Sequence, residues 1–308
     1  MPFLARLLFR PLAALSLLGL PGCATFVDSA TTAEAQQYPP GPALWAVSDA
    51  DTTIYLFGTV HSLPSDVDWF KGPVQHAFAV SDELVTEVSV GDTGAMQQEL
   101  LARAQLPKGQ SLRGLMSKAD RILFEETLVS LGLPVEALDR FKPWYAAMML
   151  SVLPLAKAGF GAESGVEMVL SRDAPGKKMS ALETVEQQIE LFDGLPMAAQ
   201  VSFLNQTVTS LNMVGETVAE MVARWLEGDA NALARLLNAE IDDPVLRDRL
   251  LTRRNANWAE WIDRRLQQPG TVFVAVGAGH LAGKGSVQDQ LKARGITTAR
   301  VVEQPVAE

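Results

Sequence analysis

A short pattern occurs twice in the sequence, near opposite ends of the chain, and it limits the folds that the chain can form. Gly58-Thr59-Val60-His61 follows the apolar run 53–57, and Gly277-Ala278-Gly279-His280 follows the apolar run 271–276. Both runs are typical of buried strands. Because the chain holds only three histidines, two at the same place after a strand indicate that they meet in space. We therefore expect the two ends of the chain to share one sheet.

The remaining patterns predict an α/β fold. Apolar and β-branched runs predict strands near 44–47, 53–60, 83–89, 178–182, 271–277 and 298–302. Apolar residues at three- and four-residue spacing predict helices over 119–131, 143–158, 196–227, 230–240 and 244–267. We predict one α/β domain over residues 44–308. Its central sheet is built from both chain ends, and a large helical insertion, about 92–267, forms a cap or second lobe.

The two histidines predict a metal site at the rim of this sheet. Side chains at strand ends project into the cleft where open α/β sheets bind ligands, and two neutral imidazoles that meet there suit a divalent ion. The glycine three residues before each histidine lets the backbone pass close to its neighbours and to an ion. Each histidine alone also fits a core residue at a turn, and the duplication favours the shared site.

A catalytic metal site needs a carboxylate beside the two histidines. Glu87 is the first candidate, because it lies in the apolar run 84–88, where a carboxylate is costly to bury unless a cation pairs with it. On an edge strand it would instead face water. Glu183 is the second candidate, as a reserve acid–base group, and its alternative is a charge at a helix N-terminus.

The helix predicted over 244–267 carries Arg254 and Asn255 among apolar residues. Such a pair can hold a carboxylate or stabilise an oxyanion, or lie on a solvated face. His76, on a predicted helix, is interpreted as a structural residue.

The first 22 residues predict an export signal, with Arg6 and Arg10 before a short apolar stretch. The signal ends at Cys23, the only cysteine, and this arrangement resembles the lipidation site of bacterial lipoproteins. Residues 24–43 are interpreted as a flexible tether. We expect a protein exported to the periplasmic face of a bacterial membrane and held there by a lipid on Cys23, or a soluble periplasmic protein if the signal is simply removed.

Charge and motifs exclude several other classes. The net charge is −10, which disfavours nucleic acid as a partner. The glycines from Gly277 to Gly283 are spaced G-x-G-x-x-x-G, and this differs from a dinucleotide-binding loop, so no nucleotide is expected. The sequence has no G-x-S-x-G elbow, and the only cysteine lies on the tether, so serine and cysteine hydrolases lack a nucleophile here.

Taken together, these residues resemble the TraB/GumN family, to which the Tiki metalloproteases are similar, from Leu44 to Val302. The matching pieces are both Gly-x-x-His motifs, Glu87, Gly165-Val166-Glu167, 181–188, and Arg254-Asn255 with Trp258. One departure is Glu167, where aspartate is usual. The resemblance implies a fold similar to the erythromycin-esterase and ChaN-like proteins.

The resemblance also implies a metal-dependent peptidase of the cell envelope, with His61, His280 and Glu87 as the active centre around a divalent ion (Mn, Zn or Co). Its substrate would be a peptide or protein of the envelope. The alternative is an envelope lipoprotein that binds a peptide or a metal without catalysis, in a process linked to polysaccharide or conjugation functions.

Overall fold

A six-stranded sheet, in the order β6-β4-β7-β2-β1-β8, forms the centre of the fold. Its strands are β1 (Leu44–Ser48), β2 (Thr52–Thr59), β4 (Glu83–Thr86), β6 (Lys178–Ala181), β7 (Gly270–Gly277) and β8 (Ala299–Arg300). The computed structural model describes residues 41–89, 93–239 and 244–302. The predicted signal, Cys23 and most of the tether therefore lie outside the described residues.

The two ends of the chain meet in the middle of this sheet. β2 and β7 pair in parallel, with Thr59 opposite Gly277, so the prediction that both ends share a sheet is confirmed. β7 also pairs in parallel with β4, and β4 with β6, whereas β1 is antiparallel to β2 and β8. The carboxyl ends of β6, β4, β7 and β2 consequently lie at one edge of the sheet. The predicted mixed α/β class is confirmed.

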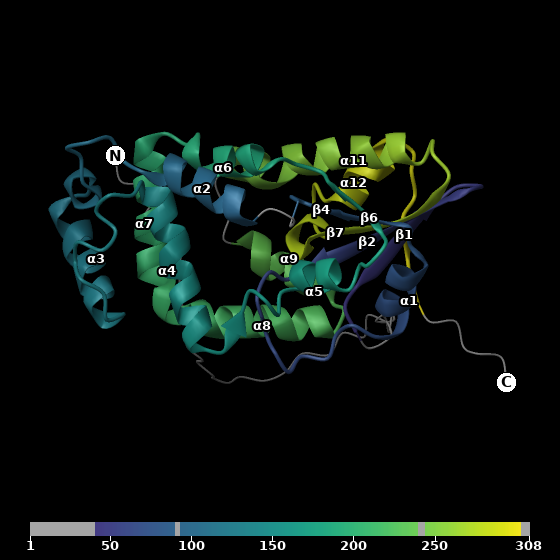
Figure 1. The fold of residues 1–308 in the computed structure, drawn as a ribbon, viewed down its shortest axis with the longest axis horizontal. Coiled ribbons are helices and arrows are strands. Elements are labelled where there is room, and N and C mark those ends of the chain that lie inside the picture. The colour runs from purple at the N-terminus through teal and green to yellow at the C-terminus, as the bar shows by residue number, and fades with distance from the viewer. Residues whose placement is uncertain (1–40, 90–92, 240–243, 303–308) are drawn as a thin grey trace, which may run out of the picture. The chain divides into compact units, whose positions relative to one another are not determined.

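Helices cover both faces of the sheet (Figure 1). The helices of the described residues are α1 (Gly72–Val80), α2 (Thr93–Ala104), α3 (Lys118–Ser130), α4 (Pro143–Lys157), α5 (Val166–Arg172), α6 (Val185–Asp193), α7 (Met197–Ser210), α8 (Val214–Leu226), α9 (Ala230–Ala239), α10 (Pro244–Arg247), α11 (Arg253–Arg265) and α12 (Val287–Ala293). A two-stranded ribbon pairs β3 (Leu63–Pro64) with β5 (Phe160–Gly161).

Alternation along the strands divides the core into two layers. Phe57 and Phe273 pack with Trp225 on the face covered by α1, α5 and α8. Ile54 and Val274 point to the other face and pack with residues of α11 and α12. Since these strand side chains are buried on both faces, a run such as β7 is almost continuously apolar, as a central parallel strand requires.

Helices α2, α3, α4, α6 and α7 gather beside the sheet (Figure 1). Leu128 of α3, Leu150 of α4 and Leu204 of α7 belong to a core of their own. Local signals begin these helices. The Ser117 side chain accepts a hydrogen bond from the Asp120 N–H at the start of α3, and Thr184 with Gln187 forms a capping box at the start of α6.

Two predicted helices differ from the structure. The helix expected over 196–227 is interrupted by a 3₁₀ turn, Leu211–Met213. Before this turn the Ser210 hydroxyl donates a hydrogen bond to the Gln206 carbonyl, the kind of local bond that competes with continued helix. The helix expected over 244–267 contains a π-helical turn, Asp248–Thr252, directly before α11. The periodicity of apolar residues does not reveal either interruption.

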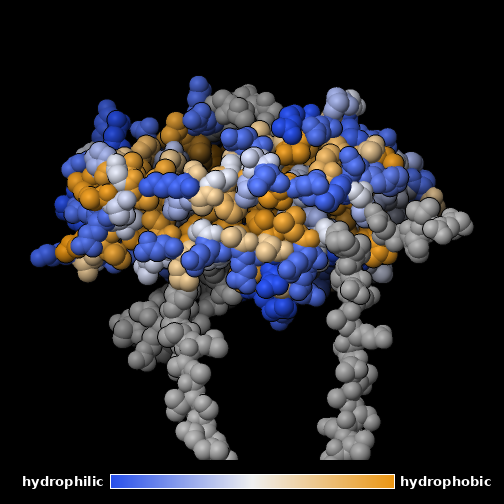
Figure 2. Space-filling view, turned by 90° about the horizontal axis from the view of Figure 1, so that it is seen from below, coloured by the Kyte–Doolittle hydropathy of each residue, from blue (hydrophilic) through white to orange (hydrophobic). Residues whose placement is uncertain are grey.

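The surface of the helical group is partly apolar. Ile122, Leu123 and Val129 of α3 and Met148, Met149 and Val152 of α4 are exposed. Figure 2 shows apolar patches among charged side chains toward the end of the molecule where these helices lie. Within the described residues, none of the helices has the length and hydropathy needed to cross a bilayer.

Candidate functional site

Four neighbouring parallel strands each lead to a polar residue at the same edge of the sheet. Glu87 directly follows β4, His61 lies two residues beyond β2, and Glu183 lies two residues beyond β6. His280 closes the 3₁₀ turn Ala278–His280, which follows β7. The strand predicted over 83–89 ends at Thr86, so Glu87 lies just outside it. Carboxyl ends of parallel strands are where open α/β sheets place ligand sites.

His61 is oriented by a carboxylate from α5. Its Nδ1 lies 2.7 Å from Oε1 of Glu167, and the Thr59 hydroxyl donates to the same oxygen at 2.5 Å. The close approach of the start of α5 to the His61 backbone requires glycine at 165, because a Cβ there would lie 2.1 Å from the His61 carbonyl oxygen. Glu167 stands where the family usually has aspartate. In the structure its carboxylate binds Nδ1 of His61 and so orients the ring.

The bond from Glu167 raises the pKa of His61 to about 9. Because the His61 side chain is 73% exposed, water screens this attraction and salt weakens it further. Burial acts to raise the pKa of Glu167, but the bonds from His61 and Thr59 outweigh burial and hold that pKa below its usual value. At neutral pH the pair is thus an imidazolium and a carboxylate when nothing else binds His61.

Glu87 accepts hydrogen bonds on both of its oxygens. The Gly277 N–H donates to Oε1 at 2.7 Å, while Arg254 and Gln188 donate to Oε2 at 2.6 and 2.9 Å. Burial opposes ionisation, but the neighbouring imidazoles, the Arg254 guanidinium and the Gly277 N–H outweigh it and lower the pKa of Glu87 to about 2. Glu87 is therefore a carboxylate at neutral pH, better suited to binding a cation than to taking up a proton.

Arg254 joins the two predicted carboxylates. Its Nε and Nη2 donate to the two oxygens of Glu183 at 2.7 and 2.8 Å, and Nη2 also donates to Glu87. The guanidinium stacks 4.7 Å from the ring centre of Trp258, whose Nε1 donates to Glu183 at 3.1 Å. The alternative of a solvated face does not hold for this arginine, because its side chain is only 12% exposed.

His280 is buried and uses both ring nitrogens. Nε2 lies 3.0 Å from Nη1 of Arg254, and Nδ1 lies 2.6 Å from Oδ1 of Asn255. Because a guanidinium only donates hydrogen bonds, Nε2 accepts and Nδ1 carries the proton that it donates to Asn255. Burial is the main cause that lowers the pKa of His280 to about 3, so the ring is neutral.

The three side chains implied as the active centre converge around Gly277. A Cβ at that position would lie 3.1 Å from Glu87 Oε1, 3.6 Å from His280 Cδ2 and 3.9 Å from His61 Nε2. The first motif supplies the matching close approach, since a Cβ at Gly58 would lie 3.1 Å from the Cα of Ala278. Each motif glycine thus lets its backbone pass close to residues of the other motif, as expected from the sequence.

The donors at this edge fit a divalent ion in part. His61 Nε2 has no hydrogen-bond partner among the described residues, and carboxylates that orient an imidazole, as Glu167 does here, are common beside metal-binding histidines. Within the part of the chain that the structure describes, Glu87 Oε1 accepts only the Gly277 N–H. His280 Nε2 is already occupied by Arg254, and within the described parts of the chain no three His, Cys, Asp or Glu side chains are grouped for a metal. His61 and Glu87 therefore fit as ligands, and His280 does not fit in this arrangement.

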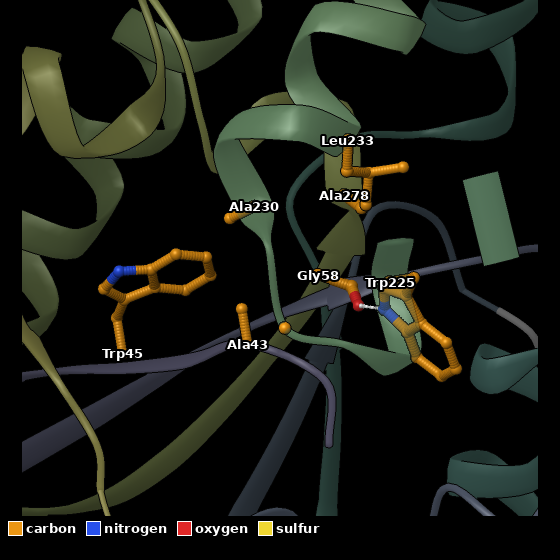
Figure 3. A pocket seen from close by; sticks show the side chains of 8 residues that line it. Ala43, Trp45, Gly58, Trp225, Ala230, Leu233 and Ala278 are labelled. Atoms are coloured by element: carbon orange, nitrogen blue, oxygen red, sulfur yellow. Dashed lines mark hydrogen bonds between the residues drawn. The ribbon is translucent and has the colours of Figure 1, made fainter. Parts of the chain in front are cut away.

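An apolar recess adjoins the two motifs (Figure 3). Gly58 and Ala278 line it together with Trp45 and Leu233, and Trp225 donates a hydrogen bond to the Gly58 carbonyl at 2.7 Å. None of the residues that line it is ionisable, so the recess supports the packing of the motifs and supplies no catalytic group.

Sequence comparison identifies a family and several relatives. The sequence model of the TraB/PrgY/gumN family matches residues 43–300. An uncharacterized protein of Treponema pallidum is 22% identical over 81% of this chain and 80% of its own length, and the uncharacterized protein YbaP of Escherichia coli is 25% identical over 82% and 92%. Metalloprotease TIKI2 of Danio rerio is 25% identical, and the match covers 78% of this chain but only 57% of the zebrafish protein. No solved structure matches this chain.

Proposed function

The chain belongs to the TraB/PrgY/gumN family, and we propose that it is a metal-dependent peptidase whose active centre lies at the carboxyl ends of β2, β4 and β7. The observation that carries this proposal is the convergence of His61, Glu87 and His280 around Gly277, although the two histidines are 219 positions apart in the sequence. Relatives named as metalloproteases support the reaction class.

His61 and Glu87 would hold the divalent ion. A bound ion would act as a Lewis acid that polarises a peptide carbonyl and activates water. The chain itself supplies the arrangement: Glu167 fixes the His61 ring so that Nε2 faces the site, and Arg254 with the Gly277 N–H fixes the Glu87 carboxylate. Before it can bind a cation through Nε2, the His61 imidazolium, which Glu167 stabilises, must lose its Nε2 proton.

Arg254 has a second property that suits peptide hydrolysis. It is a permanent cation beside Glu87, in a part of the site where its side chain is 12% exposed. A fixed cation in such surroundings stabilises negative charge that develops on a peptide carbonyl oxygen. Asn255 donates from Nδ2 to the Gly285 carbonyl at 2.8 Å and accepts from His280, so its role is to hold that ring.

The alternative is capture of a peptide or a metal without turnover. The ion pairs that join Arg254 to Glu87 and Glu183 favour this alternative, because they already satisfy much of the charge at the site. For either function we propose an exported lipoprotein attached through Cys23, acting on envelope peptides. Mass spectrometry of the mature N-terminus in wild type and Cys23→Ser tests the attachment, and an unmodified Cys23 would refute it.

Hydrolysis of an unfolded protein substrate tests the reaction. Wild type is incubated with Mn²⁺, Zn²⁺ or Co²⁺ and with chelator, beside His61→Ala and the control His76→Ala, whose histidine is exposed on α1. The proposal expects metal-dependent cleavage that His61→Ala loses and His76→Ala keeps. Metal binding without cleavage would support capture, and cleavage that persists in chelator would refute the metal dependence.

A further inference from the structure

The geometry points to His280 as a positioning residue for Arg254 and not as a metal ligand. This inference rests on the proposed metal-dependent function and divides the labour of the two Gly-x-x-His motifs. The first motif presents an imidazole to the ion, whereas the second motif presents an imidazole to an arginine.

The first argument is the use of the His280 ring. A metal ligand needs an unprotonated nitrogen whose lone pair is directed at the ion. The proton on Nδ1 is donated to Asn255 at 2.6 Å, and the lone pair on Nε2 accepts from Arg254 at 3.0 Å. Both nitrogens therefore have protein partners. His61 differs, because Glu167 occupies only its Nδ1.

The second argument is the anchoring of Arg254. Its guanidinium donates to Glu183 through two nitrogens, to Glu87 and to the Leu250 carbonyl, and it stacks on Trp258. The side chains of Arg254, Glu183 and Glu87 are each 11–12% exposed. Moving the guanidinium away to free His280 would leave two carboxylates in a poorly hydrated place without their cation, which is costly.

The third argument is charge. An ion bound to His280 Nε2 would lie beside a guanidinium that cannot lose its proton, and two cations at that separation repel. Arg254 binds Glu87 through Oε2, whereas Oε1 accepts from the Gly277 N–H instead. The arrangement forms a line from Asn255 through His280 and Arg254 to Glu87, and its effect is to hold Oε2 of Glu87 while Oε1 stays available.

The same substitution at each motif tests this division. His280→Gln keeps a hydrogen-bond acceptor near the position of Nε2, whereas the matched control His280→Asn is too short to reach Arg254. His61→Gln makes the identical change at the proposed ligand. The affinity for Mn²⁺ is measured by isothermal titration calorimetry, and thermal unfolding is measured in chelator.

We expect His280→Gln to bind Mn²⁺ within about threefold of wild type, His280→Asn about tenfold more weakly, and His61→Gln more than 100-fold more weakly. In chelator, His280→Asn should unfold about 4 °C below wild type because Arg254 loses an acceptor, and His280→Gln should stay close to wild type.

Equal loss of Mn²⁺ affinity in His61→Gln and His280→Gln would overturn the inference. If wild type binds no Mn²⁺, the proposed metal dependence fails, and unfolding in chelator decides the inference by itself. It then stands if His280→Gln resembles wild type while His280→Asn does not, and it falls if both variants are destabilised equally.

Discussion

A methyl group added at Gly277 tests the convergence of the site more directly than removal of any ligand. Gly277→Ala keeps the backbone N–H that donates to Glu87. Its φ of −49° and ψ of 133° are accessible to alanine, so the backbone itself is not strained. The new Cβ would lie 3.1 Å from Glu87 Oε1, and the carboxylate must shift by a few tenths of an ångström to make room.

The expected effect on stability is small. Replacing glycine by alanine at a compatible backbone position gains about 0.4–1 kcal/mol by restricting the unfolded chain. Crowding of the 2.7 Å bond between Gly277 and Glu87 offsets this gain, so the free energy of unfolding should change by less than about 1 kcal/mol. The expected effect on function is larger, about tenfold in kcat/KM and in metal affinity, because sub-ångström displacement of a reacting group is costly.

Chemical denaturation, calorimetric Mn²⁺ titration and peptide hydrolysis measure the three quantities. Gly215→Ala is the matched control, since a Cβ there would meet only Ala158 Cβ at 4.0 Å and helix α8 should gain about 1 kcal/mol. Full Mn²⁺ affinity and full activity in Gly277→Ala would show that Glu87 and His61 do not act together at this position. A loss of stability comparable to an overpacked core, about 3 kcal/mol, would show that Gly277 serves the fold.

Four further outcomes are expected. Between pH 6 and 9 the Mn²⁺ affinity of wild type should rise about tenfold per pH unit, because the ion displaces a proton from His61. In Glu167→Gln this rise should end near pH 6.5. A flat wild-type profile in calorimetric titration would contradict the pairing of His61 with Glu167. In chelator the same pair stabilises the fold between about pH 4.5 and 6.5. Its contribution should fade as pH rises toward 9 and as pH falls through the lowered pKa of Glu167, and melts across this pH range measure both changes. Gly165→Ala should cost about 3 kcal/mol of unfolding free energy, since its Cβ would lie 2.1 Å from the His61 carbonyl oxygen, and an unchanged denaturation midpoint would refute that contact. Arg113 donates hydrogen bonds to Asp139 and thereby lowers the pKa of that carboxyl. Arg113→Met should cost about 2 kcal/mol of unfolding free energy at pH 7. The deficit should shrink in acid, because wild type also loses the pair when pH falls through the lowered pKa of Asp139, and circular dichroism melts at pH 7 and in acid measure both values.

The sharing of one sheet by both chain ends was predictable because strong local signals coincide there, whereas the order of its strands was not. The run from Thr271 to Val276 is apolar and β-branched throughout, as a strand buried on both faces must be, and the repeated Gly-x-x-His pattern links it to the run before His61. The short ribbon β3–β5 was not predictable, since two-residue strands have no periodicity.

The candidate site was predictable in its members but not in their partners. Glu87 and Glu183 were recognised as carboxylates near strand ends, and Arg254 as a group that can hold a carboxylate. The sequence did not indicate that this one arginine, 71 positions beyond Glu183, binds both of them. Ion pairs between such distant positions leave no pattern in the sequence. The π-helical turn before α11 is equally hidden, because apolar residues keep nearly the same spacing through it.

The order of the strands has a consequence for how the chain folds. β7 begins at residue 270 but inserts between β2 and β4, which end at residues 59 and 86. Before β7 is in place, β2 and β4 have no strand between them. Pairing of β7 with both is long-range in the sequence, and such pairing is slow to form. His61 and Glu87 then have no Gly277 between them. A chain that ends before residue 277 therefore lacks both Gly277 and His280, and the proposed site cannot form without the second motif.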